Sequence, residues 1–251
     1  MISLKNKVTI ITGGSRGIGA ATALLFARAG SDIVLNYIKN DAKAEAVANC
    51  VRSFGRNIVL HKGDVADSRT ANELIEQAVT SFKRFDIVVN NAGIWTHGEI
   101  GDMSEDIWDE TIDTNLKSVF NVCNAAIPHL KRSKGGWIVN IASTAGQRGE
   151  AFHAHYAASK GGILAFTRSL AVEVAPFGIR VNAVAPGWVD TEMNEEVFAD
   201  KQFRADAVEG IPLKRIATAE DIAGPVLFLA SDFARHITGA TINVNGGSVL
   251  S

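Results

Sequence analysis

The chain has 251 residues, of which 47% are hydrophobic and 21% charged, and its formal net charge is −2. These proportions are typical of a globular protein with a sizeable core, and a chain so close to neutrality lacks the basic surface needed to bind nucleic acid or an acidic membrane. Its two cysteines, Cys50 and Cys123, exclude a disulfide framework and suit a reducing compartment. The N-terminal "MISLKNKVTIITGG" lacks the apolar run of a signal peptide, and no segment approaches the ~18 apolar residues of a membrane span, so we expect a cytoplasmic protein.

Short runs rich in β-branched residues alternate with segments of helical periodicity along the whole chain. The seven candidate strands are residues 7–12, 32–37, 57–63, 85–90, 136–142, 179–185 and 240–245. They are almost continuously apolar, which is typical of strands covered on both faces. The alternation predicts an α/β fold with one Rossmann-like domain over residues 1–251, built on a doubly wound parallel sheet of about seven strands with helices on both faces.

The first candidate strand is followed by "TGGSRGIG", residues 12–19, and then by a helical pattern. Glycine allows a tight turn and a close approach of the backbone to a ligand, and the start of the helix offers unpaired N–H groups to phosphate oxygens. The spacing of Gly13, Gly17 and Gly19 is wider than in the G-x-G-x-x-G fingerprint, so the motif alone fits a plain turn equally well. Its position after the first strand favours a nucleotide site.

Two further segments, "GDV" (63–65) and "NNAG" (90–93), end the third and fourth candidate strands. The carboxyl ends of parallel strands form the ligand crevice where the strand order reverses. There Asp64 can accept a hydrogen bond from an adenine amino group, and Val65 can contact the ring. Either segment alone is ordinary turn chemistry, but together with the glycine loop they predict a dinucleotide site.

The second candidate strand ends in "LNYIKN" and has no carboxylate before Asp41. Enzymes that use NAD usually carry an acidic residue about 20 residues past the glycines, where it binds the ribose 2′-hydroxyl. Its absence predicts NADP(H), whose 2′-phosphate would meet no repulsion near Asn36. Arg16 is expected to give that phosphate a charge-assisted hydrogen bond, with Lys39 as a second cation. The alternative is that Arg16 is merely solvated.

The stretch "HAHYAASKGG", residues 153–162, places Tyr156 and Lys160 four positions apart on a predicted helix, so the two side chains share a face. An ammonium about 4.5 Å from the phenol would lower its pKa from about 10 to about 7 or 8, where it can exchange a proton near neutrality. The small residues beside the pair are expected to leave room for a cofactor ring and a substrate. Taken alone, such a pair is more often an ordinary contact on a helix surface.

Two polar residues strengthen a catalytic interpretation of this pair. Ser143 ends the strand in "GWIVNIAS" and can hold a substrate oxygen beside the tyrosine. Asn115 lies among apolar neighbours in "DTNLKSVF" and needs a polar partner if it is buried. His153, His155 and Glu150 are close by, but three potential ligands on one loop do not predict a metal site, and we expect none.

The segment from Pro186 to about Ile216 is the one long region without a strand pattern. Connections of this length in compact domains are usually functional lids, and we expect a substrate lid at about 186–216. It includes "NEEVFADKQFRADAVEG", which can form one or two short helices. Trp188 in this segment and Trp95 after "NNAGI" are candidates for the walls of a substrate pocket, although lone aromatic residues serve packing equally well.

In chain order, "TGGSRGIG", "NNAG", Asn115, Ser143, "YAASK" and "APGWVDT" resemble the short-chain dehydrogenase/reductase family, and the likeness extends from about Leu4 to Gly247. The resemblance implies that Tyr156 is the general acid/base and that Ser143 positions the carbonyl. It implies that Lys160 lowers the tyrosine pKa and binds the nicotinamide ribose, and that Asn115 holds a proton-relay water. The expected catalytic residues are therefore Asn115, Ser143, Tyr156 and Lys160.

The same resemblance implies a cofactor site that extends over much of the chain. Its expected members are Gly13, Ser15, Arg16, Gly17, Ile18, Gly19, Asn36, Asp64, Val65, Asn91, Ala92, Gly93, Tyr156, Lys160, Pro186, Gly187, Val189 and Thr191. It also implies a homotetramer, paired through the helices around 104–133 and 156–176 and through the C-terminal strand.

The pattern is closest to that of 3-oxoacyl-(acyl-carrier-protein) reductases of fatty acid biosynthesis. It predicts hydride transfer between NADP(H) and a carbonyl or secondary alcohol, with a 3-oxoacyl thioester of acyl carrier protein or coenzyme A as substrate. Docking of the acidic carrier is expected to be weak, because Val172 and Phe177 stand where such reductases often carry basic residues. Sugar, polyol and small-ketone dehydrogenases of the family stay as alternatives. A non-catalytic nucleotide-binding regulator is the alternative of another class, although such proteins typically lack the tyrosine or the lysine.

Overall fold

A computed structural model describes residues 2–250, and its central element is one seven-stranded sheet. The strands are β1 (Val8–Ile11), β2 (Asp32–Tyr37), β3 (Ile58–Lys62), β4 (Ile87–Asn90), β5 (Gly136–Ile141), β6 (Ile179–Pro186) and β7 (Thr241–Val244). Their order across the sheet is β3-β2-β1-β4-β5-β6-β7, and every neighbouring pair is parallel. The doubly wound parallel sheet predicted from the sequence is confirmed. Its order reverses between β1 and β4, where a ligand crevice is expected at the carboxyl ends of the strands.

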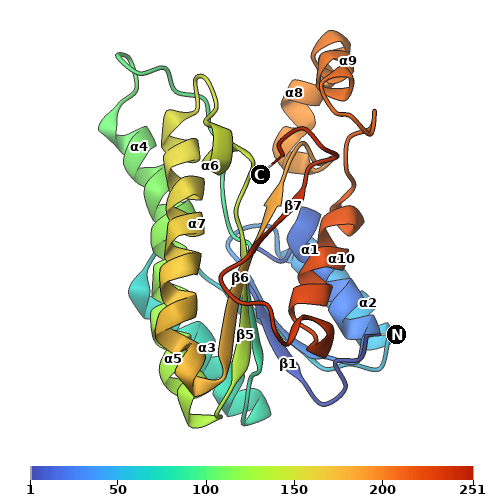
Figure 1. Ribbon diagram of the computed structural model, residues 1–251. Coiled ribbons are helices and arrows are strands. Elements are labelled where there is room, and N and C mark those ends of the chain that lie inside the picture. Colours follow the sequence, from blue (N-terminus) through green and yellow to red (C-terminus); the bar gives the residue numbers. More distant parts are fainter. Residues whose placement is uncertain (1, 251) are drawn as a thin grey trace.

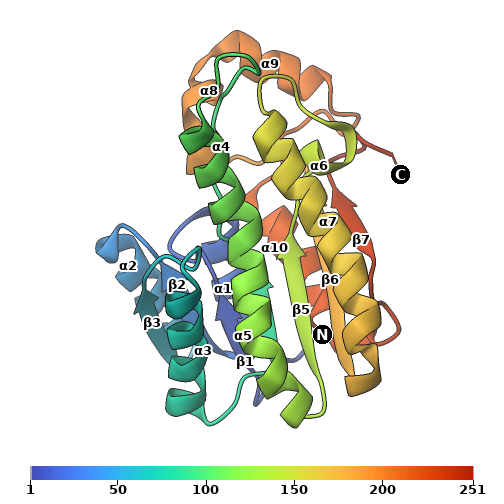
Figure 2. The ribbon, with the colours of Figure 1, turned by 90° about the vertical axis from the view of Figure 1, so that its left-hand side faces the viewer.

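Helices cover both faces of the sheet (Figures 1 and 2). One face carries α1 (Gly17–Arg28), α2 (Asp41–Ser53) and α10 (Ala219–Leu229). The other carries α3 (Ser68–Phe82), α5 (Ser118–Arg132) and α7 (Ala154–Val174). Shorter elements are α4 (Glu105–Ile112), the π-helical turn η1 (Asp113–Lys117), α6 (Ala145–Arg148), η2 (Ala175–Phe177) and η4 (Asp232–Ala234). Within residues 2–250, no helix is long and apolar enough to cross a membrane.

Two apolar layers, one on each side of the sheet, explain why the strands lack an alternating pattern. On the side of α1, α2 and α10, Phe26, Ile33 and Leu35 are fully buried. On the side of α3, α5 and α7, Leu74 and Leu130 are equally buried. Because both faces of each central strand contact a core, almost every position in it must be apolar.

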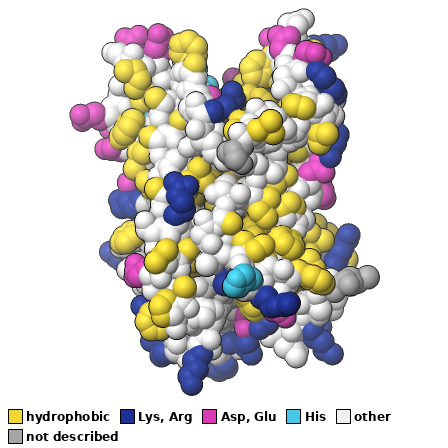
Figure 3. Space-filling model, viewed as in Figure 1, with side chains coloured by type: hydrophobic (Ala, Val, Ile, Leu, Met, Phe, Trp, Pro, Cys, Tyr) yellow, Lys and Arg dark blue, Asp and Glu magenta, His cyan; other side chains and the backbone are white. Residues whose placement is uncertain are grey.

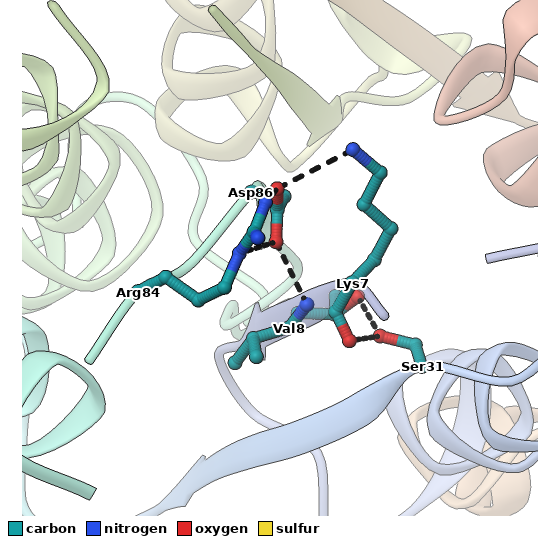
Figure 4. A network of polar contacts seen from close by, with 6 residues as sticks. Lys7, Val8, Ser31, Arg84 and Asp86 are labelled. Atoms are coloured by element: carbon teal, nitrogen blue, oxygen red, sulfur yellow. Dashed lines mark hydrogen bonds and ion pairs between the residues drawn. The ribbon is translucent and has the colours of Figure 1, made fainter. Parts of the chain in front are cut away.

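A polar network fixes the beginning of β1 against β4 at the amino ends of the strands (Figure 4). The Asp86 carboxylate accepts a hydrogen bond from the Val8 amide at 3.0 Å, and it pairs with Lys7 at 3.4 Å and with Arg84. The Ser31 hydroxyl donates to the Lys7 carbonyl at 3.2 Å, which links the start of β2 to the same point. The network lies at the end of the sheet opposite the crevice, so its role is structural.

The segment 186–216 forms short helices above the carboxyl ends of the strands, at the top of Figure 1. They are η3 (Glu192–Asn194), α8 (Glu195–Ala199) and α9 (Lys201–Glu209). Phe198, Ile211 and Ile216 form a small apolar cluster of their own, against which Trp188 packs. This cluster is separate from the two main cores, so the segment is held by less buried apolar surface than the helices on the sheet.

Candidate active site

A cavity of about 750 Å³ lies at the carboxyl ends of the strands, between the sheet and the segment 186–216. In the space-filling view of Figure 3, the upper end of the molecule is hollowed between the side of α4 and α7 and the side of α8 and α9. Every predicted cofactor residue except Gly19 lines this cavity, and so do the predicted catalytic residues Ser143, Tyr156 and Lys160. The structure thus brings together residues that are up to 178 positions apart in the chain, from Gly13 to Thr191.

The loop between β1 and α1 is shaped to receive an anion. Gly13 and Gly17 have φ values of 63° and 53°, which L side chains rarely adopt, and a Cβ on Gly13 would lie 2.8 Å from the Ala92 Cα. No side chain caps the start of α1, so its first N–H groups remain available to a ligand. Unpaired amides at the positive end of a helix dipole are a binding site for phosphate oxygens.

Gly19 does not line the cavity, which corrects the prediction of a cofactor contact there. A Cβ at this position would lie 2.5 Å from the Gly13 carbonyl oxygen and 2.6 Å from the Asn91 side chain. Glycine is therefore needed at residue 19 for close packing inside the loop.

Two of the predicted cofactor residues have side chains that hold the protein backbone. The Asn91 amide donates to the carbonyls of Thr12 and Gly13, both at 3.0 Å, and so fixes the glycine loop against the end of β4. The Asn36 amide donates to the Gly63 carbonyl at 2.9 Å and to the His61 carbonyl at 3.3 Å, which ties the ends of β2 and β3 together. Both residues line the cavity, but they shape it through the backbone segments that they hold.

Tyr156, Ser143 and Lys160 meet at one wall of the cavity. Tyr156 is 9% exposed, and the Ser143 side chain is close enough to its phenol to affect its pKa. The Lys160 ammonium lies 5.7 Å from the centre of the tyrosine ring and donates to the Ile141 carbonyl at 3.0 Å. A Cβ on Gly93 would come within 3.4 Å of this ammonium, so the end of β4 also approaches the site closely.

The predicted pKa of about 7 or 8 for Tyr156 is wrong for the chain by itself. Burial raises the pKa of Tyr156 to about 12, the Ser143 hydrogen bond lowers it, and the negative charge of Glu150 raises it further. Burial also lowers the pKa of Lys160 to about 8, so this amine is partly neutral just above pH 7. The expectation considered only attraction between the two side chains, whereas removing both from water disfavours both charged forms.

Asn115 is fully buried and does not line the cavity. Its side-chain oxygen accepts from the Ile94 amide at 2.7 Å, and its amide donates to the Ile94 carbonyl at 3.0 Å and to the Ser159 hydroxyl at 3.1 Å. These are the polar partners that a buried asparagine requires. Both polar atoms of the Asn115 side chain already have protein partners, so the predicted relay water would have to bind another group. Asn115 also lies in a π-helical turn, a backbone irregularity that often accompanies functional sites.

The small residues beside Tyr156 serve helix packing. A Cβ on Gly146 in α6 would lie 2.5 Å from the Gly161 amide nitrogen in α7, and a Cβ on Gly162 would lie 2.7 Å from the Leu116 side chain. None of residues 157–159, 161 and 162 lines the cavity, so the expectation that they make room for a cofactor is wrong. They let α7 pack closely against α6 and η1, and this packing holds Tyr156 and Lys160 in place.

Aromatic rings and charged groups line the end of the cavity next to Tyr156. Trp95 stacks on His153 with ring centres 4.3 Å apart and meets Trp188 edge-on at 5.9 Å, and both tryptophans line the cavity. Arg148 and Glu150 line the same region. In the part of the chain that the structure describes, no three His, Cys, Asp or Glu residues are placed to hold a metal ion.

The other end of the cavity holds an ion-pair cluster that the sequence did not indicate. The Glu192 carboxylate pairs with Arg16 at 3.2 Å and with Lys43 at 2.6 Å. The end of the second strand carries no carboxylate, as expected, but Glu192 brings one to Arg16 from 176 positions further along the chain. Asp41, the nearest acid in sequence, is bound by Lys62 at 2.9 Å and does not line the cavity.

Comparisons with known proteins agree with this fold and site. Residues 13–249 match a family model described as enoyl-(acyl carrier protein) reductase. The chain is 41% identical over 245 residues to a 3-oxoacyl-(acyl-carrier-protein) reductase of Staphylococcus epidermidis, a match that covers 98% of this chain and all of the relative. It is 38% identical to the protein of the same name from Chlamydia trachomatis, over 97% of this chain and 98% of that one. A solved structure of a putative short-chain alcohol dehydrogenase from Sinorhizobium meliloti superposes with a TM-score of 0.94 at 35% identity, covering 98% of this chain and 97% of that one.

The fold and the site define an oxidoreductase that works with a nicotinamide cofactor. The chain belongs to the short-chain dehydrogenase/reductase family.

Proposed function

We propose that the chain reduces 3-oxoacyl thioesters with NADPH, that Ser143, Tyr156 and Lys160 are its catalytic residues, and that Asn115 positions Tyr156 through Ser159, whose hydroxyl bonds to the Tyr156 carbonyl. The observation that carries the proposal is that Ser143, Tyr156 and the buried Lys160 line one wall of the same cavity. Relatives of nearly the same length that are named 3-oxoacyl-(acyl-carrier-protein) reductases support the substrate class.

The residues of the cavity suit a dinucleotide. The glycine loop and the uncapped start of α1 can receive the diphosphate, and Asp64 and Val65 are placed at the end of β3 for the adenine. Lys160 can donate to the nicotinamide ribose, while Pro186, Gly187, Val189 and Thr191 line the wall next to it. When bound, the reduced nicotinamide supplies a hydride to the carbonyl carbon of the substrate.

Tyr156 completes the reduction as a general acid. Because its pKa is raised, it carries a proton near neutral pH, and it transfers this proton to the carbonyl oxygen as that oxygen gains negative charge. The Ser143 hydroxyl holds the same oxygen in position. Lys160, with a pKa lowered to about 8, can return a proton to the tyrosine oxygen from its ammonium form. The balance is one hydride to carbon and one proton to oxygen, which gives the secondary alcohol.

NADP(H) is the proposed form of the cofactor, since Arg16 and Lys39 line the cavity near the end of β2 and Asp41 does not. The segment 186–216 would act as the substrate lid. A homotetramer would cover exposed apolar side chains such as Trp108 on α4 and Phe120 on α5.

A small polar ketone, sugar or polyol is the second candidate substrate. Trp95 and Trp188 narrow the cavity next to Tyr156, and the charged side chains of Arg148 and Glu150 line it there. Such walls suit a compact polar molecule better than a long acyl chain.

The deciding experiment follows the absorbance of the reduced cofactor with acetoacetyl-coenzyme A, acetoacetyl-carrier protein, sugars, simple ketones and quinones. Turnover of both thioesters with NADPH supports the proposal. Activity on a sugar or ketone alone would replace the acyl substrate, and cofactor binding without turnover of any compound would favour a regulator. An equal or higher kcat/KM with NADH that is unaffected by Arg16→Ala would refute the preference for NADPH.

A further inference from the structure

Glu192 joins three distant parts of the chain at the edge of the cavity. It is the first residue of η3 in the proposed lid, and its two carboxylate oxygens contact different cations. One oxygen accepts from Arg16 Nη1 in the glycine loop at 3.2 Å, and the other pairs with Lys43 Nζ in the first turn of α2 at 2.6 Å. Two cations that converge on one carboxylate form a site that an anion of similar geometry can also occupy.

The position of this cluster connects it with the ribose end of the proposed cofactor site. Arg16, Lys39, Asn40 and Glu192 all line the same cavity at the end of β2. Lys39 makes no ion pair with any of residues 2–250 and adds a further positive charge beside the cluster. A phosphate on the ribose 2′-oxygen would therefore reach cations that Glu192 already holds.

We infer that Glu192 competes with the 2′-phosphate of the cofactor for Arg16 and Lys43, and so weakens the preference of this chain for NADP(H) over NAD(H). The inference rests on the cofactor site proposed above. It makes Glu192 a specificity-determining residue and adds Lys43 to the cations that contact the phosphate.

The expected effect is moderate. The side chains of Arg16, Lys43 and Glu192 are 55%, 43% and 36% exposed, so water and salt screen their interactions. A phosphate brings more charge and more acceptor oxygens than a carboxylate, so it can displace Glu192. Glu192 should therefore reduce the affinity for the phosphorylated cofactor several-fold and leave its binding intact.

The test is the dissociation constant of each cofactor, measured by calorimetry without substrate. Glu192→Gln should tighten NADPH binding about fivefold, because it removes the carboxylate that forms partly solvated ion pairs with Arg16 and Lys43. NADH binding should change by less than about twofold, because NADH has no group that competes with the carboxylate. The matched control is Glu196→Gln on α8, which removes the same charge from an exposed residue outside the cavity.

Lys43→Ala gives an independent result. It should weaken NADPH binding about threefold in the wild type and more strongly in the Glu192→Gln background, where no carboxylate competes for Lys43, and it should leave NADH binding unchanged. The Asn40 cap of α2 bonds to the Lys43 backbone amide, so the substitution leaves this cap in place.

Three results would overturn the inference: no gain for NADPH in Glu192→Gln, an equal gain for both cofactors, or the same gain in Glu196→Gln. An equal loss for both cofactors in Lys43→Ala would remove Lys43 from the phosphate site. Failure to reduce any 3-oxoacyl thioester would refute the proposed substrate and leave these binding results unaffected.

Discussion

Replacing Lys160 with methionine should stabilise the protein near neutral pH although it abolishes turnover. The Lys160 side chain is 4% exposed, and among residues 2–250 no carboxylate pairs with it. Its ammonium donates to the Ile141 carbonyl at 3.0 Å, and burial lowers its pKa from the ordinary value of 10.5 to about 8. Folding at pH 7 therefore requires a protonated amine to leave water with little compensation.

The magnitude follows from this pKa difference. A change from 10.5 to about 8 corresponds to an unfavourable contribution of about 3 kcal/mol to folding at pH 7. Methionine has a similar length and no charge, but it leaves the Ile141 carbonyl without its donor, which costs about 1–2 kcal/mol. The net gain in the free energy of unfolding is then about 1–2 kcal/mol, and the Tm rises by roughly 2–8 °C for a chain of this size.

The pH dependence identifies the cause. The folded-state pKa is depressed, so Lys160 contributes almost no penalty above pH 10.5, and the penalty grows as the pH falls from 10.5 to about 8 and stays constant below that. The gain in Lys160→Met should therefore be complete at pH 7 and give way to a loss of about 1 kcal/mol at pH 10.5, where only the missing donor to the Ile141 carbonyl remains. Urea unfolding of the cofactor-free protein at both pH values, at one fixed protein concentration, measures it. The control is Lys5→Met, since Lys5 is exposed. A less stable Lys160→Met at pH 7, or a gain of equal size at both pH values, would refute the reasoning.

Three further outcomes are expected. Tyr156→Phe should bind cofactor normally and lose about 10²–10⁴-fold in kcat, and more than about a tenth of wild-type kcat would exclude its role as general acid. Gly146→Ala should lower the free energy of unfolding by about 1–3 kcal/mol, because its Cβ would lie 2.5 Å from the Gly161 amide nitrogen. The control is Gly224→Ala, whose Cβ would have no atom within 4 Å, so its free energy of unfolding should not fall. The kcat/KM for acetoacetyl-carrier protein should exceed that for acetoacetyl-coenzyme A only slightly, since Val172 and Phe177 are exposed apolar residues that offer no charge to the acidic carrier. A large, salt-sensitive advantage for the carrier would contradict this.

The strands could be predicted from the sequence because their signal is local. Each candidate range contains or nearly coincides with the observed strand, as residues 32–37 do with β2 (Asp32–Tyr37) and residues 136–142 with β5 (Gly136–Ile141). Burial on both faces requires a continuous apolar run, and the glycines and polar residues at the ends mark the turns. The position of each strand end then places the residues that line the cavity.

Features that depend on contacts distant in sequence could not be predicted. Nothing near Arg16 in the chain indicates Glu192, and the pairing exists only because η3 folds over the glycine loop. The need for glycine at residues 146 and 162 follows from how close α6 and η1 lie to α7, a separation that spacing along one helix does not determine. Asn36 and Asn91 were expected in the cofactor site, but the sequence around them does not indicate that their amides donate to backbone carbonyls of other segments.

The raised pKa of Tyr156 shows that Tyr156 and Lys160 alone do not account for catalysis of the reaction in both directions. With a pKa of about 12, the phenol holds its proton and suits reduction, but the reverse oxidation would need a phenolate. Burial, Ser143 and Glu150 set this pKa, and Lys160 is not among the groups that lower it. We infer that an oxidised nicotinamide bound next to the tyrosine would lower the pKa of the phenol by its positive charge.

This reasoning predicts a cofactor-dependent titration. The chain has two tyrosines, and burial raises the pKa of both Tyr37 and Tyr156, so tyrosinate absorbance of the cofactor-free protein should stay low below about pH 10. Saturating NADP⁺ should lower the pKa of one tyrosine, so that its tyrosinate absorbance appears at a lower pH. In Tyr156→Phe this low-pH absorbance should be lost, and only the titration of Tyr37 should remain. NADPH, whose nicotinamide is neutral, should leave the titration near that of the cofactor-free protein. Equal curves with NADP⁺ and NADPH would mean that the charge of the nicotinamide does not set the pKa of Tyr156, and that the site must obtain its phenolate in another way.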